Sequence, residues 1–264
     1  MSRWLVSNVP PWLLLLALIV VMVGGSMLLQ SVIRRRFPQL KGEAHNDVTK
    51  FAFGFVGFVF AFFVGFLVSN LWGQHHDAAG GARAEGAAGA QLARDLRVFD
   101  KGDRDRTRQS LLDYEHAAEE EWPLAAEGRS YPAADAALSR LYDAYGQVTA
   151  RTDAQKTLLA TSFANLDKVS QARTARVLTA RTDQGPPWSL WAVIFLTSAL
   201  VLGCSIIYGV EAPRMHYAMV ATVATLVAAE LFLILQLAYP YIGEIGVSAE
   251  PLREVARVAS TPSP

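Results

Sequence analysis

Four long apolar stretches constrain this chain more than any other feature of its sequence. They cover residues 12–33, 51–72, 188–210 and 218–239, and each is about 22 residues long. At a rise of 1.5 Å per residue, a helix of that length spans about 33 Å, enough to cross the ~30 Å hydrocarbon layer of a bilayer. Soluble core helices are usually shorter and carry a polar face. The sequence therefore predicts an all-α membrane protein with four transmembrane helices.

The first stretch is predicted to remain as a membrane helix. Its apolar run is too long for a cleaved signal peptide, and it ends in Arg34-Arg35-Arg36, a stop-transfer pattern. The predicted organisation is an N-terminal tail with the first span (1–33), a short basic loop (34–50), the second span (51–72), a polar helical segment (73–187), the third span (188–210), a short loop (211–217), the fourth span (218–239) and a C-terminal amphipathic tail (240–264).

The polar segment is rich in Ala, Arg, Asp, Glu and Leu, which favours helices. We expect a helix break at Gly102 with Asp103 as the next cap, and a helix end at Trp122-Pro123. Ser130 followed by Pro132 is typical of another helix start. No stretch alternates apolar and polar residues with period two, so the segment is predicted to form about four antiparallel helices and no sheet.

Three further local patterns concern helices. Thr152 and Gln155 have the spacing of a capping box, in which each side chain hydrogen-bonds the other residue's backbone. The Ala/Gly run at residues 78–90 is either a helical extension of the second span or a looser linker. Residues 247–259 form a predicted amphipathic helix that lies at the membrane interface or against the middle helices.

Composition excludes several classes of function. The 24 basic and 24 acidic side chains give a formal net charge of zero, so nothing suggests a nucleic-acid partner. Cys204 is the single cysteine, which excludes an intrachain disulfide and a cysteine metal site. There is no phosphate-binding loop, no Gly-x-Ser-x-Gly and no His-Glu-x-x-His. We therefore expect no enzyme, with no catalytic residue, no metal and no cofactor.

Orientation is predicted from the charges of the short loops. Five basic residues fall in loop 34–50 and Arg214 lies in the second short loop, whereas the N-terminal tail has only Arg3. Lys and Arg near membrane helices are retained in the cytoplasm. This predicts a multi-pass protein of the cell membrane with cytoplasmic short loops, and with both termini and the middle segment outside. Aromatic residues near one end of each span would then mark one membrane face: Trp12, Trp72, Trp188, Trp191, Tyr239 and Tyr241.

The second span contains an unusual phenylalanine run. Residues 51–66 read FAFGFVGFVFAFFVGF and hold eight of the thirteen Phe in the chain. At about 100° per residue, two neighbouring strips emerge. One strip, the Phe stripe, contains Phe51, Phe55, Phe58, Phe62 and Phe66. The other, the small strip, contains Gly54, Gly57, Ala61 and Gly65, a spacing that lets membrane helices approach closely.

Two interpretations of the Phe stripe remain open. The rings can simply face lipid acyl chains, where Phe is favourable. Alternatively they face an oligomer axis and form a hydrophobic constriction that gates by dewetting. Phe53, Phe60 and Phe63 lie on other faces of the same helix.

Glu230 is the second candidate functional residue because it lies near the middle of the fourth span. An ionisable group at membrane depth is costly and marks a functional site by default. It either donates a structural hydrogen bond as a protonated acid, with Ser26, Gln30, Thr197 and Ser205 as available partners, or lines a water-filled ion path.

A set of short motifs in a fixed order resembles a bacterial family described as bestrophin-like, a domain of unknown function. The motifs are Ala44-His45-Asn46-Asp47-Val48, Trp72, Glu121-Trp122-Pro123, Arg173-x-x-Arg176-Val177-Leu178 and Pro240-Tyr241-Ile242-Gly243-Glu244-Ile245-x-Val247. The family-motif residues taken from them are His45, Asn46, Asp47, Glu121, Trp122, Pro123, Arg173, Arg176, Pro240 and Gly243.

The resemblance implies a more distant link to bestrophins, which are pentameric anion channels with four membrane helices per chain. Bestrophins place aromatic and aliphatic side chains of the second membrane helix at a hydrophobic neck, the location of the Phe stripe. They also keep the segment between the second and third spans in the cytoplasm, opposite to the side that the loop charges favour. Glu119-Glu120-Glu121 is too short to match the calcium clasp of animal bestrophins.

Two functions follow as hypotheses. The first is a homo-oligomeric membrane protein with a central path for ions, small anions above all. The second is a non-conducting membrane scaffold or sensor whose helical segment binds an envelope component or a partner protein. In both, the lipid bilayer is the immediate partner.

Overall fold

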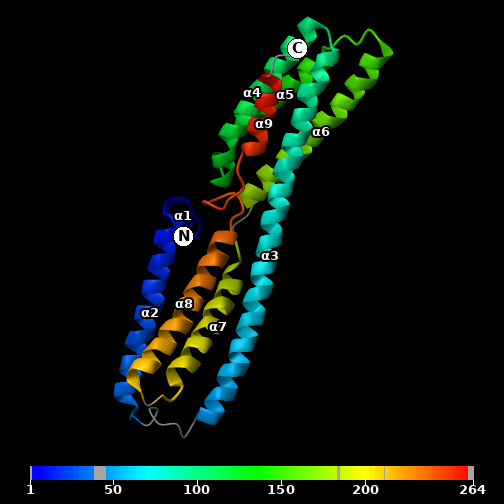
Figure 1. Ribbon diagram of the computed structural model, residues 1–264. Helices are drawn as coiled ribbons and strands as arrows, with labels where there is room; N and C mark the ends of the chain where they lie inside the picture. Colours follow the sequence, from blue (N-terminus) through cyan, green and yellow to red (C-terminus); the bar gives the residue numbers. More distant parts are fainter. Residues whose placement is uncertain (1, 39–45, 183–184, 211, 261–264) are drawn as a thin grey trace. The chain divides into compact units, whose positions relative to one another are not determined.

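The chain is helical throughout the part that the structure describes. The computed structural model describes residues 2–38, 46–182, 185–210 and 212–260. In chain order, its elements are α1 (Ser2–Asn8), α2 (Pro11–Arg36), α3 (Asn46–Asp95), the short 3-10 helix η2 (Leu96–Val98), α4 (Lys101–Ala126), α5 (Pro132–Gly146), α6 (Asp153–Thr182), α7 (Trp188–Ile207), α8 (Pro213–Leu237) and α9 (Glu250–Ser260) (Figure 1).

The predicted fold class is confirmed. Among the described residues, four helices are long and apolar enough to cross a membrane: α2, α3, α7 and α8. Helices also fill the segment between α3 and α7, and no strand occurs in the described ranges. Three helices begin at a proline, namely Pro11, Pro132 and Pro213. Proline suits the first helical position because its missing N–H would have no intrahelical partner there.

The Ala/Gly run at residues 78–90 is a helical extension of the second span. Helix α3 continues without interruption for 50 residues, from Asn46 to Asp95. The capping box is also confirmed at the start of α6. The Gln155 backbone N–H donates to Thr152 Oγ1 over 3.2 Å, and the Thr152 N–H donates to Gln155 Oε1 over 3.3 Å.

The predicted helix break at Gly102 is wrong by a few residues. Helix α4 already includes Gly102, and the chain turns at Phe99 and Asp100, whose backbone is extended. A glycine in a first turn disturbs little, because few intrahelical bonds have formed there. Asp103 caps nothing at the helix start. Its carboxylate instead accepts hydrogen bonds from the Thr149 backbone N–H and from Arg106.

The predicted helix end at Trp122-Pro123 is also wrong. Helix α4 includes Pro123 and continues to Ala126. The chain leaves the helix two residues later at Gly128, whose φ of +80° is accessible to glycine at little cost. The Gly128 N–H donates to the Ala125 carbonyl and the Arg129 N–H to the Leu124 carbonyl. This pair of bonds is the Schellman motif, a common way for a helix to end.

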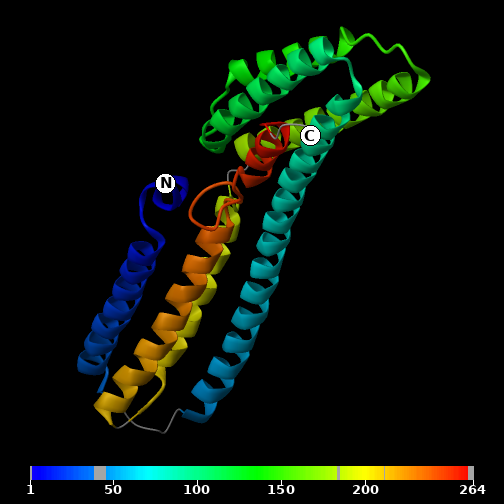
Figure 2. The same ribbon diagram turned by 45° about the horizontal axis from the view of Figure 1, so that its top comes forward.

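The chain divides into two compact units, which are described separately. The membrane unit comprises Met1–Gly73, Gln184–Tyr239 and Gly243–Ile245, and the polar unit comprises Gln74–Asp183, Pro240–Ile242 and Gly246–Pro264. In the membrane unit, α2, α7, α8 and the first part of α3 form a bundle of roughly parallel rods, with α8 packed against α2 and α7 (Figures 1 and 2). Its buried cluster joins α3, α7 and α8 through Phe60, Val64, Leu67, Leu71, Ile194, Val201, Leu202, Ala224, Val227, Leu231, Ile234 and Leu237.

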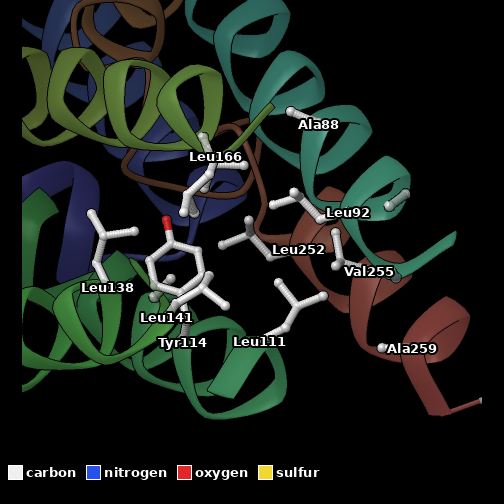
Figure 3. Packing of buried hydrophobic residues seen from close by; sticks show 14 of the residues in the cluster. Ala88, Leu92, Leu111, Tyr114, Leu138, Leu141, Leu166, Leu252, Val255 and Ala259 are labelled. Atoms are coloured by element: carbon white, nitrogen blue, oxygen red, sulfur yellow. The ribbon is translucent and has the colours of Figure 1, made fainter. Parts of the chain in front are cut away.

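The core of the polar unit joins five helices. Figure 3 shows Ala88 and Leu92 of α3 meeting side chains of α4, α5, α6 and α9, among them Leu111, Tyr114, Leu138, Leu141, Leu166, Leu252, Val255 and Ala259 (Figure 3). Helix α9 is the predicted amphipathic C-terminal helix, and its apolar side packs against the middle helices. Leu252, Val255 and Ala259 are buried on that side. On the outer side, Arg253 Nε lies 2.6 Å from Oε1 of Glu119 on α4.

Two glycines in the Ala/Gly run explain how α9 packs on α3. A Cβ added at Gly86 would lie 2.6 Å from the Pro251 carbonyl oxygen, and one at Gly89 would lie 2.9 Å from Val255 Cγ2. Both distances are shorter than van der Waals contact. The glycines therefore allow the backbones of α3 and α9 to approach more closely than any larger residue would permit.

Only some of the aromatic residues predicted to lie at one membrane face are exposed. Trp12, Trp72 and Trp188 are exposed, as a position beside lipid headgroups requires. Tyr239 is buried in the membrane unit, where its ring lies against Gly185. Tyr241 packs edge-on against Trp122 within the polar unit. These two tyrosines are engaged in packing inside the protein.

Candidate pore face and buried charge cluster

The membrane part of α3 presents three faces, each of different chemistry. Phe60, Val64, Leu67 and Leu71 form the face that packs inside the membrane unit. At about 100° per residue, the small strip lies roughly 90° from this face, and the Phe stripe lies roughly 90° further round. Phe53 and Phe63 are half-buried against the packed face, which agrees with their predicted separation from the Phe stripe.

All five rings of the Phe stripe are exposed in the single chain. The exposed fraction of these residues runs from 62% at Phe55 to 77% at Phe51. Rings this exposed contact little else in the described part of the chain. A membrane places such a surface against either lipid or another protein chain.

The small strip is also without a neighbour in the single chain. A Cβ added at Gly54, Gly57 or Gly65 would meet no atom within 4 Å, and Ala61 is exposed. The predicted packing of this strip on a neighbouring helix therefore does not occur within the described residues.

Glu230 lies on α8, half-buried in the membrane unit. Its Oε2 atom is buried and has no hydrogen-bond partner among the described residues. Two of the predicted partners are engaged elsewhere: the Thr197 hydroxyl donates to backbone carbonyls of α7, and the Ser205 hydroxyl donates to the Leu202 carbonyl. Gln30 is fully buried, and its amide also has no partner there.

Asn46 lies at the start of α3 and holds the end of α7. Its side-chain amide donates to the Gly209 carbonyl over 2.8 Å and accepts from the Gly209 N–H over 2.9 Å. Nearby in the chain, Arg34 Nη1 lies 2.7 Å from His216 Nδ1 and donates to the Val210 carbonyl. Asp47 is exposed, and His45 lies outside the described residues.

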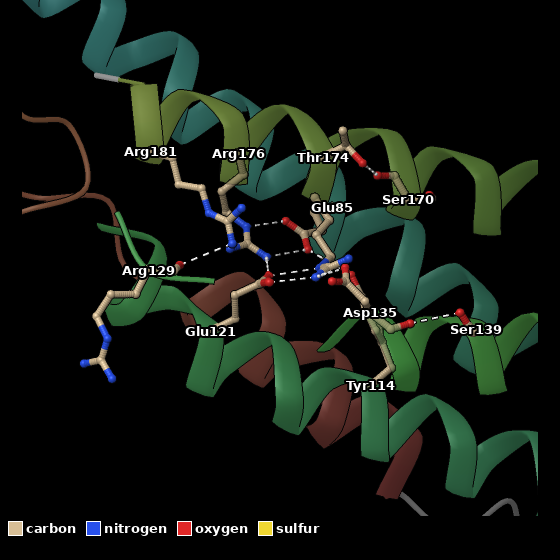
Figure 4. Close-up of polar contacts among 11 residues, drawn as sticks. Glu85, Tyr114, Glu121, Arg129, Asp135, Ser139, Ser170, Thr174, Arg176 and Arg181 are labelled. Carbon is tan, nitrogen blue, oxygen red and sulfur yellow. Dashed lines mark hydrogen bonds and ion pairs between the residues drawn. The ribbon is translucent and has the colours of Figure 1, made fainter. Parts of the chain in front are cut away.

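Four of the other motif residues come together in the polar unit as a buried charge cluster: Glu121, Trp122, Arg173 and Arg176. Arg173 donates two hydrogen bonds to the Glu121 carboxylate, over 2.6 and 2.9 Å, and a third to Asp135 over 2.8 Å. Arg176 makes the same two-pronged contact with Glu85, over 2.9 and 3.1 Å, and lies 3.6 Å from Glu121. Figure 4 shows Arg176, Glu85 and Glu121 converging from α6, α3 and α4 (Figure 4).

Burial makes these ion pairs important for folding. The side chains of Arg173, Arg176, Glu85 and Glu121 are each at most 7% exposed. Burial alone lowers the pKa of Arg173, but its hydrogen bonds to Glu121 and Asp135 outweigh this and the net pKa is raised. Burial raises the pKa of Tyr114 as well, and the negative charge of Glu85 adds to the effect. The Tyr114 hydroxyl stays protonated and donates to Glu85 over 3.1 Å.

Aromatic rings complete the cluster. The Arg176 guanidinium lies 4.4 Å from the centroid of the Trp122 ring, a cation–π contact. Trp122 Nε1 donates to the Val247 carbonyl over 2.9 Å, and the Val247 N–H donates to the Pro240 carbonyl. Pro240 and Val247 of the C-terminal motif are thus linked by hydrogen bonds to Trp122 of the charge cluster.

The sequence profile of the Bestrophin-like domain matches residues 11–252 of this chain. The match covers the four spans and the polar segment, and it ends at the third residue of α9. This chain belongs to the bestrophin-like family. No curated protein sequence matches it closely enough to add a more specific relationship.

Solved structures of bacterial bestrophin homologues share the fold. A single-residue variant of a bestrophin homologue from Klebsiella pneumoniae is 14% identical, with a TM-score of 0.71 over 94% of this chain and 99% of that chain. A second variant is 16% identical, with a TM-score of 0.65 over 94% and 99%. A structure described as a membrane protein is 14% identical, with a TM-score of 0.69 over 92% and 96%. At these identities the likeness concerns the fold alone.

Sequence reasoning selected several residues of the charge cluster in this bestrophin-like chain but missed others. Glu121, Trp122, Arg173 and Arg176 were chosen as motif residues, and the structure brings them together. Pro123, on the same helix, is exposed. Glu85, Tyr114 and Glu115 were not selected, and neither was the pair of Arg34 and His216. An acidic residue inside an Ala/Gly run is the one signal that could have identified Glu85.

Among the described residues, no three His, Cys, Asp or Glu side chains gather to hold a metal ion. The buried arginines and carboxylates pair with one another, which suits a structural part of the protein. The Phe stripe of α3 is one of the exposed apolar surfaces in the described part of the membrane unit.

Proposed function

We propose that this bestrophin-like protein is a homo-oligomeric ion channel of the cell membrane. In this proposal α3 lines a central path, and the Phe stripe closes that path as a hydrophobic neck. The observation that carries it is the exposure of all five rings on one face of a helix that buries another face inside its own chain. Water and ions leave an apolar constriction, so a ring of such side chains is a closed gate.

The small strip supports an oligomer in the same geometry. It lies beside the Phe stripe and has open space at Gly54, Gly57 and Gly65. When one face of a helix points to a central axis, the adjoining face meets the same helix of the next copy. Small side chains at that contact let two membrane helices approach closely. Contact with lipid would not require two ordered strips of different chemistry side by side.

Small anions are the proposed permeant ions. The support is membership of the bestrophin-like family and its resemblance to bestrophins, which conduct anions. The proposed orientation follows the loop charges: short basic loops in the cytoplasm, and the polar segment and termini outside. Glu230 is proposed to border the ion path as an intramembrane carboxylate, because its Oε2 has no partner among the described residues.

Ion flux through purified protein in liposomes tests the proposal. Replacing Phe58 or Phe62 by Ala widens the neck and is expected to raise the flux of chloride above that of the native protein. Phe195→Ala is the matched control, because Phe195 is an exposed ring on α7 rather than on the Phe stripe. Equal flux in all these variants would leave the Phe stripe as a lipid-facing surface.

The same preparation separates the channel from the alternative of a scaffold or sensor. A channel of this design requires several copies around an axis, so the detergent-solubilised protein is expected to be an oligomer by light scattering. A monomer has no central axis and would exclude the proposed path. Replacing chloride by a large organic anion, with cations held constant, tests the anion selectivity in the same liposomes.

A further inference from the structure

Glu115 is a buried carboxyl group without a hydrogen-bond partner among the described residues. It lies on α4 in the polar unit and is 3% exposed. Both of its carboxyl oxygens are buried, and neither has a hydrogen bond to any described residue. A Cβ added at Gly89 would lie 2.9 Å from Glu115 Oε1 and 2.9 Å from Val255 Cγ2. The carboxyl therefore lies where α3, α4 and α9 meet.

An ionised carboxylate is unstable in such a place. Moving a charge from water into a protein interior is costly unless a partner compensates it, and an unpaired group gives up its charge by binding a proton. Burial raises the pKa of Glu115 well above its ordinary value of 4.5, and the negative charge of Glu85 raises it further, while Arg176 acts in the opposite direction.

The charged and titratable groups around Glu115 come from the elements packed around it. Helix α3 supplies Glu85, helix α6 supplies Arg176, and α4 itself supplies Tyr114. Arg176 is already bound to Glu85 by two hydrogen bonds. Helix α9 meets the carboxyl with Val255, whereas its charged residues lie on the exposed side of the helix: Glu250, Arg253, Glu254 and Arg257.

We propose that Glu115 is a proton-binding site that controls the docking of α9 on the polar unit. With a proton bound, Glu115 is a neutral side chain of the apolar core and α9 stays in place. Without the proton, the carboxylate needs water, and the shortest route to water is to displace α9. This proposal is independent of whether the protein conducts ions.

Helix α9 is the element expected to be displaced, because it is short and only a few of its side chains are buried against the polar unit. It has 11 residues, and its buried anchors are Leu252, Val255 and Ala259. The outer contact between Arg253 and Glu119 is exposed and contributes little. By contrast, α3, α4 and α6 are each at least 26 residues long and are joined by the buried ion pairs.

The direction of the pH effect follows from linkage. A group whose pKa is raised in the folded state binds its proton more tightly there than in the released state. The docking free energy that depends on Glu115 is therefore fully present below about pH 4.5 and is lost as the pH rises through the raised pKa. Between about pH 4.5 and the raised pKa, release of α9 becomes up to tenfold more favourable for each pH unit, and above the raised pKa it changes no further.

Accessibility of a cysteine on α9 measures this release in the full-length protein. Ala259 lies on the buried side of α9. In a Cys204→Ser background, Ala259→Cys therefore provides a single thiol that maleimide reaches only when α9 is released. The labelling rate is measured between pH 6 and 9 with Glu115 present and with Glu115→Gln. At each pH the labelling rate with Glu115 is divided by the rate with Glu115→Gln. This ratio cancels the ordinary effect of pH on the reactivity of the thiol.

The proposal predicts a ratio that rises with pH, by up to tenfold for each pH unit, until the raised pKa of Glu115 is reached. Asp113→Asn, an exposed carboxylate two positions away on α4, should behave like the protein with Glu115. A ratio that stays within twofold from pH 6 to 9 would overturn the proposal. Glu115→Met is a second neutral variant, and failure of both neutral variants to fold would equally contradict a protonated Glu115.

Discussion

Glu121 and Arg173 illustrate what residue-level reasoning could and could not predict. Both were selected from the sequence as motif residues, but their pairing across 52 positions was not. Arg176 and Glu85 lie 91 positions apart, and Glu85 was missed altogether. Local patterns describe neighbours within one or two helical turns, whereas an ion pair depends on which helices pack together. The residue types were therefore predictable, and their contacts were not.

The buried pair gives a prediction on stability. Glu121→Gln removes one charge and leaves Arg173 buried with only the exposed Asp135 as an ionic partner. We expect a loss of about 3–5 kcal/mol of folding free energy, the usual cost of breaking a buried ion pair from one side. Thermal unfolding in detergent measures it. Asp153→Asn is the control, because its carboxylate is 98% exposed, and it should leave the unfolding midpoint nearly unchanged.

Glu230 gives a prediction on conductance at the same scale. Gln has almost the same shape, so Glu230→Gln should preserve folding and assembly. If the carboxyl borders the ion path, chloride flux or its dependence on pH changes, because one titratable group has left the path. Flux measured in liposomes over a range of pH tests this. A flux that is unchanged at every pH would remove Glu230 from the proposed path.

At the scale of elements, hydropathy and capping patterns predicted the helices well but their ends less well. The capping box at Thr152 was correct because both of its hydrogen bonds are local. The end of α4 was wrong because Gly128, not Pro123, terminates the helix. The role of the Ala/Gly run could not be predicted either, since it depends on α9, which lies more than 150 residues away in the sequence.

Two glycines of α3 should respond in opposite directions to the same substitution. Gly89→Ala places a Cβ 2.9 Å from Glu115 and Val255, so it should push α9 away and lower the thermal stability. Gly80→Ala meets no atom within 4 Å and should raise stability by about 0.5–1 kcal/mol, because Ala is a better helix former. Unfolding midpoints of the two variants provide the comparison. Equal shifts would show that Gly89 is not needed for the close approach of α9.

At the scale of the whole molecule, the fold class and the four spans were predictable because length and hydropathy determine them. Orientation depends on a small number of charges, and assembly depends on surfaces that have no partner in one chain. The loop charges predict that Asp105, near the start of α4, lies outside the cell. Asp105→Cys in the Cys204→Ser background should therefore react with an impermeant maleimide in intact cells. Reaction only after lysis would place the polar unit in the cytoplasm.

The central claim is that the Phe stripe of α3 faces an oligomer axis, and the position of its rings in an assembled structure tests it most directly. Electron cryo-microscopy of the protein in lipid nanodiscs shows every copy together with the surrounding lipid. The account predicts that Phe58 and Phe62 of all copies converge on the symmetry axis, with Gly57 of each copy against the next helix. Rings of Phe58 and Phe62 that touch only lipid would contradict it.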